Sequence, residues 1–170
     1  MDIVIHILGI CAMLFLFLIY QQKSRKNIIL FKLLADVFWV AHYFLLGAVG
    51  GMIPNTVGIF REIVFYNRNT KKWARTPVWV AVFIIINFAW GLNTFSVWYN
   101  IIPIVASSFV TISLWINKPN LTKLITIPIC ISFLIYDIFV NSFMGMVNEI
   151  ISLISIIIYF IRNKKEKNND

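Results

Sequence analysis

The chain has 170 residues, of which 60% are hydrophobic and only 13% are charged, and its mean hydropathy is +0.83. Soluble domains are about half apolar and about a quarter charged, and a chain this short could not bury so much apolar side chain in one core. The composition therefore excludes an ordinary soluble domain and predicts an all-α integral membrane protein. A membrane helix needs about 20 apolar residues, so seven spans would leave no room for a soluble catalytic domain.

Seven apolar runs, bounded by charged and turn-forming residues, predict seven transmembrane helices. Their lengths lie near the short end of what a bilayer accepts, so little tilt is expected. The predicted spans are residues 3–20, 28–46, 51–67, 77–93, 99–116, 121–140 and 144–161.

The formal net charge of +8 follows a pattern along the chain. Every lysine and arginine between the predicted spans falls in alternate connections, namely residues 21–27, 68–76, 117–120 and the tail 162–170. The positive-inside rule then predicts a multi-pass protein of the cell (inner or plasma) membrane, with its N-terminus outside and its C-terminus in the cytoplasm. Orientation, together with attraction to anionic lipid headgroups on the cytoplasmic side, explains the charge, so no nucleic-acid partner is expected.

The seven predicted helices divide into three, one and three, and the outer groups show a weak internal repeat. Setting Asn55 against Asn148 aligns Tyr43 with Tyr136 without a gap. Because three is odd, a single linker helix lets both repeats enter the membrane from the same side, which makes them parallel. The alternative is a chance similarity between two apolar hairpins. The predicted units are a first three-helix repeat with its cytoplasmic loop (1–76), a linker helix with an outer loop (77–98), a second three-helix repeat (99–163) and a cytoplasmic tail (164–170).

Two stretches carry a family resemblance. The run QQKSRKNIILFKLLADVFWVAHYFLLGA, followed by NTVGIFREIVFYNR, resembles the bacterial inner-membrane family labelled YgjV, which implies no settled activity. The two halves are more remotely similar to the SWEET and PQ-loop transporter superfamily, whose members are three-helix bundles joined by a linker helix. In its sugar-transporting members, a Trp on the second helix and an Asn on the third helix of each bundle face the substrate.

Trp39 and Asn55 match that pattern in the first half, and Asn148 matches it in the second half, where Ser132 stands in place of the second Trp. The Pro-Gln signature of the superfamily is absent from both halves. The resemblance implies that Trp39 stacks on a small solute while Asn55 and Asn148 hydrogen-bond it from opposite sides.

Ionisable residues inside the predicted spans need a partner or a function, because a charge in the bilayer interior is costly. We expect Asp36 to pair with Arg61, with Lys32, four residues before Asp36 on the same helix face, as the competing local partner. Coupling to protons or ions is the alternative role, with Asp36 and Glu62 as candidates. His42 titrates near neutral pH or serves only in packing.

Polar side chains also form stripes along three predicted helices. Glu62 follows Asn55 by seven residues and shares its helix face, the seventh predicted helix carries Asn148 and Ser152, and the fifth carries Ser107. Such stripes line a cavity or hold helices together through hydrogen bonds. Because the two Asn residues occupy equivalent positions in the predicted repeats, we favour a central substrate-binding cavity.

Catalysis is not expected. The sequence has no HExxH, GxSxG or P-loop motif, and its two histidines, His6 and His42, fall on different predicted helices. Cys11 and Cys130 lie inside apolar runs without the spacing of metal ligands, so no metal, cofactor or disulfide is expected. The sequence therefore predicts a transporter that moves a small polar solute between two helix bundles. A membrane scaffold without transport activity is the alternative, and a second copy of the chain is a further candidate partner.

Overall fold

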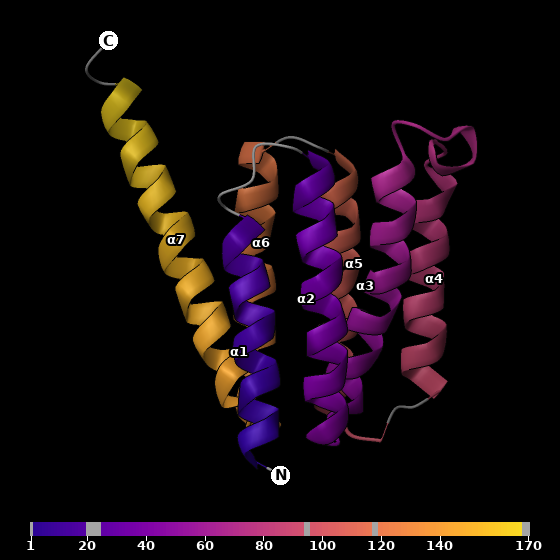
Figure 1. Cartoon of the computed structure of the whole chain (residues 1–170), viewed down its shortest axis with the longest axis vertical. Helices are drawn as coiled ribbons and strands as arrows, with labels where there is room; N and C mark the ends of the chain where they lie inside the picture. The colour runs from indigo at the N-terminus through magenta and orange to yellow at the C-terminus, as the bar shows by residue number, and fades with distance from the viewer. Residues whose placement is uncertain (1, 20–24, 94–95, 117–118, 168–170) are drawn as a thin grey trace.

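The computed structural model describes residues 2–19, 25–93, 96–116 and 119–167 (Figure 1). Within these residues all regular structure is helical, which confirms the predicted all-α fold with seven helices. The α-helices are α1 (Asp2–Ile19), α2 (Arg25–Leu45), α3 (Val49–Asn67), α4 (Val78–Asn93), α5 (Ile101–Ile116), α6 (Pro119–Phe139) and α7 (Phe143–Lys167). Two short 3-10 helices, η1 (Lys72–Ala74) and η2 (Trp98–Asn100), precede α4 and α5.

Four helical stretches in the described residues are long and apolar enough to cross a membrane: Lys26–Leu45, Trp98–Ile116, Leu121–Phe139 and Phe143–Ile161. Ile3–Ile19 and Val78–Asn93 are apolar but shorter, and α3 belongs to neither group. Large side chains on the outer faces agree with a lipid environment, because water would penalise this much exposed apolar surface. On α7 these exposed side chains are Phe143, Ile150, Ile151, Ile154, Ile157, Ile158 and Ile161.

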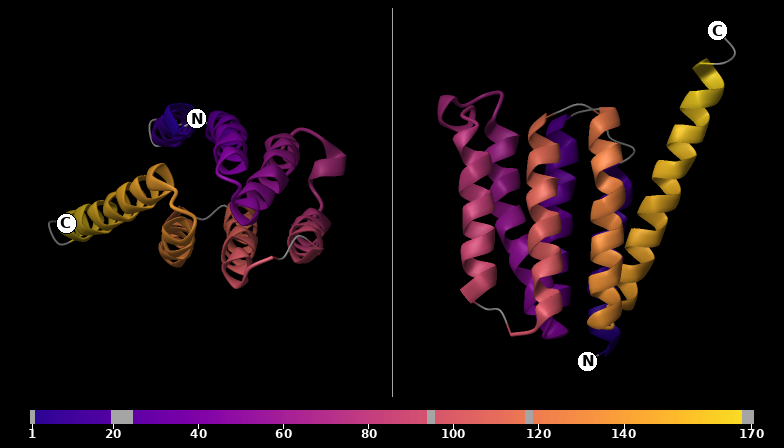
Figure 2. Two further views of the ribbon diagram at one scale, coloured as in Figure 1. Left: turned by 90° about the horizontal axis from the view of Figure 1, so that it is seen from below. Right: turned by 180° about the vertical axis from the view of Figure 1, so that it is seen from behind.

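The helices stand side by side, with α1 to α3 on one side of the molecule and α5 to α7 on the other (Figure 2). Neighbours in sequence pack together within each group, α3 packs against α5, and α1 packs against α7, which links the groups at both edges. Helix α4 packs against α3 and α5. As a result α3 is enclosed by α2, α4 and α5.

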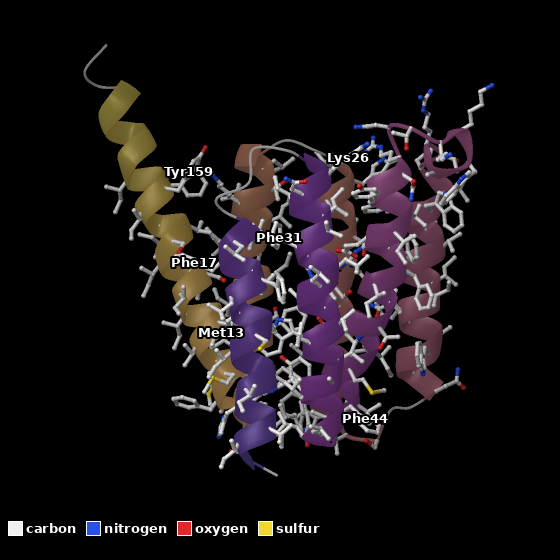
Figure 3. The ribbon with its side chains drawn as sticks, in the orientation of Figure 1. Met13, Phe17, Lys26, Phe31, Phe44 and Tyr159 are labelled. Carbon is white, nitrogen blue, oxygen red and sulfur yellow. The ribbon has the colours of Figure 1, made fainter. Side chains whose placement is uncertain are left out.

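The connections alternate between two ends of the molecule. The start of α1 lies at one end together with the α2–α3, α4–α5 and α6–α7 connections, and we call this the N-terminal end (Figure 1). The end of α7 and the α3–α4 connection lie at the opposite, C-terminal end. Helix α2 starts near Lys26 at the C-terminal end of the molecule and finishes near Phe44 at its N-terminal end (Figure 3). Toward the C-terminal end, α7 leans away from the other helices (Figures 1 and 2).

Helix α7 is longer than its predicted span. The expected tail begins within the helix, which continues to Lys167. Lysine, arginine and glutamate are good helix formers, so the helix continues past the last apolar residue. Loss of hydropathy at residue 162 therefore marks the end of the apolar segment and not the end of the helix.

The turns at α2–α3 and α6–α7 have the same backbone geometry. Gly47 and Asn141 both have positive φ, 68° and 53°, the left-handed conformation that commonly ends a helix. One residue later, the N–H of Ala48 donates to the carbonyl of Tyr43, and the N–H of Ser142 donates to that of Asp137, each at 2.9 Å. Asn adopts this conformation more readily than other residues with a side chain, which explains its use in the second turn.

These turns define a correspondence between the halves that differs by one residue from the ungapped sequence alignment. When Gly47 is matched with Asn141, Asn55 corresponds to Glu149, and Asn148 corresponds to Pro54. The matched positions Gly51 and Gly145 are both glycine. The ungapped alignment of Asn55 with Asn148 therefore places the two turns one residue out of register.

Candidate functional site

Four charged side chains meet inside the first group of helices. Arg61 on α3 forms two hydrogen bonds with the carboxylate of Glu62, from Nε to Oε2 at 3.2 Å and from Nη2 to Oε1 at 3.1 Å. Its Nη1 donates to Thr111 Oγ1 on α5 at 3.0 Å. The side chains of Arg61 and Glu62 are only 2% and 1% exposed. The guanidinium is therefore almost fully satisfied inside the protein.

Asp36 on α2 completes this ion cluster, which we define as Lys32, Asp36, Arg61 and Glu62. Lys32 forms an ion pair with Asp36 Oδ1, and Arg61 Nη2 lies 4.0 Å from Asp36 Oδ2. Both partners considered for Asp36 from the sequence are thus in place, with Lys32 the closer. Two cations and two anions leave the ion cluster formally neutral, which lowers the cost of burying it.

Gly58 allows α2 and α3 to approach closely at the ion cluster. A Cβ atom at this position would lie 2.5 Å from Asp36 Oδ2 and 3.2 Å from Arg61 Nη2. The first distance is shorter than real Cβ contacts, so a side chain would push the carboxylate away. The glycine in the motif NTVGIFRE is therefore required by the charged pair beside it.

A second polar group lies at the N-terminal end, where α2 and α3 meet α6. The hydroxyl of Tyr43 donates to Asp137 Oδ1 at 2.7 Å, and the backbone N–H of Gly51 donates to the hydroxyl of Tyr136 at 2.7 Å. The two tyrosine rings are in edge contact, with centroids 6.1 Å apart. These bonds connect the two groups of helices. The sequence alignment pointed to both tyrosines but not to a contact between them.

His42 extends this N-terminal polar group toward α1 and the α6–α7 turn. Its Nδ1 lies 2.9 Å from the carbonyl oxygen of Ile5, and its Nε2 lies 2.9 Å from Ser142 Oγ. A carbonyl can only accept, so Nδ1 carries the hydrogen, and in the neutral ring Nε2 accepts from the Ser142 hydroxyl. A small cavity of about 140 Å³ lies beside the ring, lined by Ile5, His6, His42, Leu46, Asn141 and Phe143.

The residues predicted to bind a solute lie in two different neighbourhoods. Trp39 is 5% exposed and stacks on Tyr43, with ring centroids 5.6 Å apart. The Asn55 amide donates to the carbonyl of Gly51 on its own helix at 2.7 Å, whereas the Asn148 amide donates to Glu149 Oε1 at 2.8 Å. Because α3 packs against α2, α4 and α5 while α7 packs against α1 and α6, the structure does not bring the two amides together.

The two predicted serines also differ. Ser107 on α5 is buried and lies 3.5 Å from Arg61 Nη1, so it belongs to the surroundings of the ion cluster. Ser152 is half-buried on α7, one turn after Asn148. Within the described part of the chain, no three His, Cys, Asp or Glu side chains lie close enough together to hold a metal ion.

Comparison with known proteins gives one result. The model of the family Imp-YgjV, described as bacterial inner membrane protein, matches residues 3–167 and confirms the resemblance seen in the sequence. No curated protein and no solved structure matches the chain, so the remote similarity to the SWEET and PQ-loop superfamily gains no support. The chain has the apolar helices that such a location requires, and it belongs to the Imp-YgjV family of bacterial inner membrane proteins.

Proposed function

We propose that this membrane protein transports a small polar solute by opening a pathway between its two groups of helices, first to one side of the membrane and then to the other. The main support is the difference between the two ends. At the N-terminal end, Tyr43 bonds to Asp137 and Gly51 bonds to Tyr136, which fastens α2 and α3 to α6. At the C-terminal end, α7 leans away (Figure 1).

The contact between α6 and α7 near the C-terminal end is made by long side chains. Lys123 Nζ lies 2.8 Å from the centre of the Tyr159 ring, and Tyr159 is on the part of α7 that diverges (Figure 3). A lysine contact of this kind can break and re-form without disturbing either helix. The arrangement therefore corresponds to a transporter that is closed at its N-terminal end and able to open at the other.

The basic connections suggest which end faces the cytoplasm. Residues 68–76, which contain four of the basic side chains, lie at the C-terminal end with the end of α7. We infer that this end is cytoplasmic and that the closed end faces outward. In a variant lacking native cysteines, an impermeant maleimide should label Asn141→Cys in intact cells, but Lys72→Cys only after permeabilisation. The reverse pattern would contradict this orientation.

The solute is expected to be uncharged or weakly charged, because the charges of the ion cluster already satisfy one another. Asn148 and Ser152, on the helix that diverges, are candidates to bind it, and Asn55, Trp39 and Ser107 are candidates in the first group of helices. The hydrogen bonds that now hold the two asparagine amides within their own helices would be exchanged for bonds to the solute.

A thermal-shift screen of the purified protein against sugars, nucleosides, vitamins and amino acids tests this proposal. A solute that raises the melting temperature of the wild type, but not that of a folded Asn55→Ala, Asn148→Ala variant, would support a binding site. The matched control is Asn93→Ala, because that exposed amide also bonds only to its own helix, at Ala89. No shift with any solute, together with a less stable double variant, would favour the scaffold alternative.

A further inference from the structure

Asp137 is buried without a positive partner. It has no solvent exposure, its Oδ1 accepts from Tyr43, and its Oδ2 has no hydrogen-bond partner within the described residues. Among those residues the ion pairs involve Lys32, Asp36, Arg61 and Glu62 but not Asp137. A buried carboxylate without a compensating charge is costly, and the usual remedy is that it holds a proton.

The groups that face Asp137 do not supply a cation. Tyr43 on α2 contributes a hydroxyl, and Glu149 on α7 contributes a second acidic group within electrostatic range. Tyr136, next to Asp137 on α6, contributes a second uncharged hydroxyl, and Tyr99 on η2 contacts the Tyr136 ring. Of these neighbours, the Tyr43 hydroxyl favours the carboxylate through one hydrogen bond, Glu149 opposes a second negative charge, and none carries a positive charge.

A chain of exchangeable groups connects this acid to the N-terminal surface. Ser142, the residue directly before α7, lies beside the Asp137 carboxyl group, and its Oγ lies 2.9 Å from His42 Nε2. His42 in turn lines the small cavity at the N-terminal end, together with His6. The acid, hydroxyl and imidazole thus stand in order from the interior to that cavity.

We propose that Asp137 is a proton-binding site that exchanges its proton with the N-terminal side of the membrane through Ser142 and His42. On release, the O–H bond of the Asp137 acid breaks as its proton passes to Ser142 Oγ, while the original hydroxyl proton of Ser142 forms a new N–H bond at His42 Nε2. The imidazolium then gives one proton to water in the cavity. Binding follows the same steps in reverse.

The protonation of Asp137 also affects the closure of the N-terminal end. The neutral acid can remain buried against Tyr43, whereas the carboxylate gains from contact with water and therefore favours separation of α2 from α6. If the protein is a transporter, as proposed above, this site couples solute movement to protons. The proton site itself does not depend on that function.

Infrared spectroscopy of the purified protein in lipid nanodiscs, titrated with acid and base and without any solute, tests the site. The wild type should show a C=O band of a protonated carboxylic acid that disappears at high pH, and Asp137→Asn should remove it. Asp36→Asn is the matched control, because Asp36 is equally buried but paired with Lys32, so the part of the band that Asp137→Asn removes should remain in this variant. Each variant must retain the helical circular dichroism of the wild type.

The route is tested by the rate of the same titration after a pH jump. His42→Gln, which keeps hydrogen-bonding groups but cannot take up and release a proton, and Ser142→Ala should slow the loss of the band at least about tenfold, since positioned proton carriers contribute factors of this order or larger. Absence of the band in the wild type, or a band in Asp137→Asn that is unchanged from the wild type, would overturn the site. An unchanged rate in both route variants would overturn the route. None of these results depends on solute binding. A solute screen without a hit would therefore not contradict the proton site, and a missing infrared band would not contradict solute transport.

Discussion

Removing one charge from the ion cluster should destabilise the protein more than removing two opposite charges. Arg61→Met takes away both hydrogen bonds to Glu62 and the charge 4.0 Å from Asp36 Oδ2, and leaves two anions against Lys32. Breaking a buried ion pair by deleting one partner costs about 3–5 kcal/mol. Replacing both partners with apolar side chains of similar size is often neutral, so Arg61→Met with Glu62→Met should recover most of that loss.

The free energy of unfolding can be measured by titrating detergent-solubilised protein with SDS and following tryptophan fluorescence. Glu62→Met alone completes the double-mutant cycle, and Lys72→Met in the exposed connection is the control, with an expected change within about 0.5 kcal/mol. If the double variant loses as much stability as the two single variants added together, the charges do not compensate one another and the reasoning is wrong.

Three further changes can be measured in the same way. Gly58→Ala should cost about 1–3 kcal/mol, because its Cβ would lie 2.5 Å from Asp36 Oδ2 and must displace that side chain. Arg68→Ala should cost about 1 kcal/mol, because the Arg68 guanidinium lies 3.7 Å from the centre of the Trp115 ring and its Nη1 donates to the Trp115 carbonyl at 2.7 Å. Asn141→Val should cost about 1–2 kcal/mol, because a branched side chain is strained at φ 53°, whereas Asn141→Gly should be tolerated.

Each of these expectations has an outcome that contradicts it. A Gly58→Ala variant as stable as the wild type would mean that Asp36 can move without loss. Equal stability of Arg68→Ala and the wild type would show that the Trp115 contact contributes nothing. If Asn141→Val were no worse than Asn141→Gly, the turn would not require its left-handed conformation.

The number and order of the helices could be predicted from the sequence, because membrane-spanning helices need runs of apolar residues and charged connections separate these runs. The third helix was found in the same way, although α3 falls outside the apolar candidates, because its few charges are spaced within an apolar pattern. Helix ends were harder to predict. The basic segment after residue 161 stays helical, because a drop in hydropathy indicates that the segment is no longer suited to lipid and does not indicate that the helix ends.

The contacts of the candidate site could be predicted only in two cases: where the two partners lie close in sequence, or where a charged side chain inside the membrane needs a partner of opposite charge. Lys32 and Asp36 are one helical turn apart, and this spacing predicts their contact. Arg61 needs an acidic partner, because an unpaired charge inside the membrane is costly, and this predicts its pairing with Asp36. The contact between Tyr43 and Asp137 joins residues far apart in the chain and depends on how α2 meets α6. Its one available signal was an acid in the predicted sixth span with no cation one turn away.

The enclosed position of α3 has a consequence for biogenesis. A helix that carries Arg61 and Glu62 in its last turns gains little from entering lipid alone, so its insertion depends on neighbouring helices. Asp36 has already been synthesised when α3 emerges from the ribosome, but Thr111 on α5 has not. The hydrogen bonds of Arg61 can therefore be completed only after part of the second half has been translated.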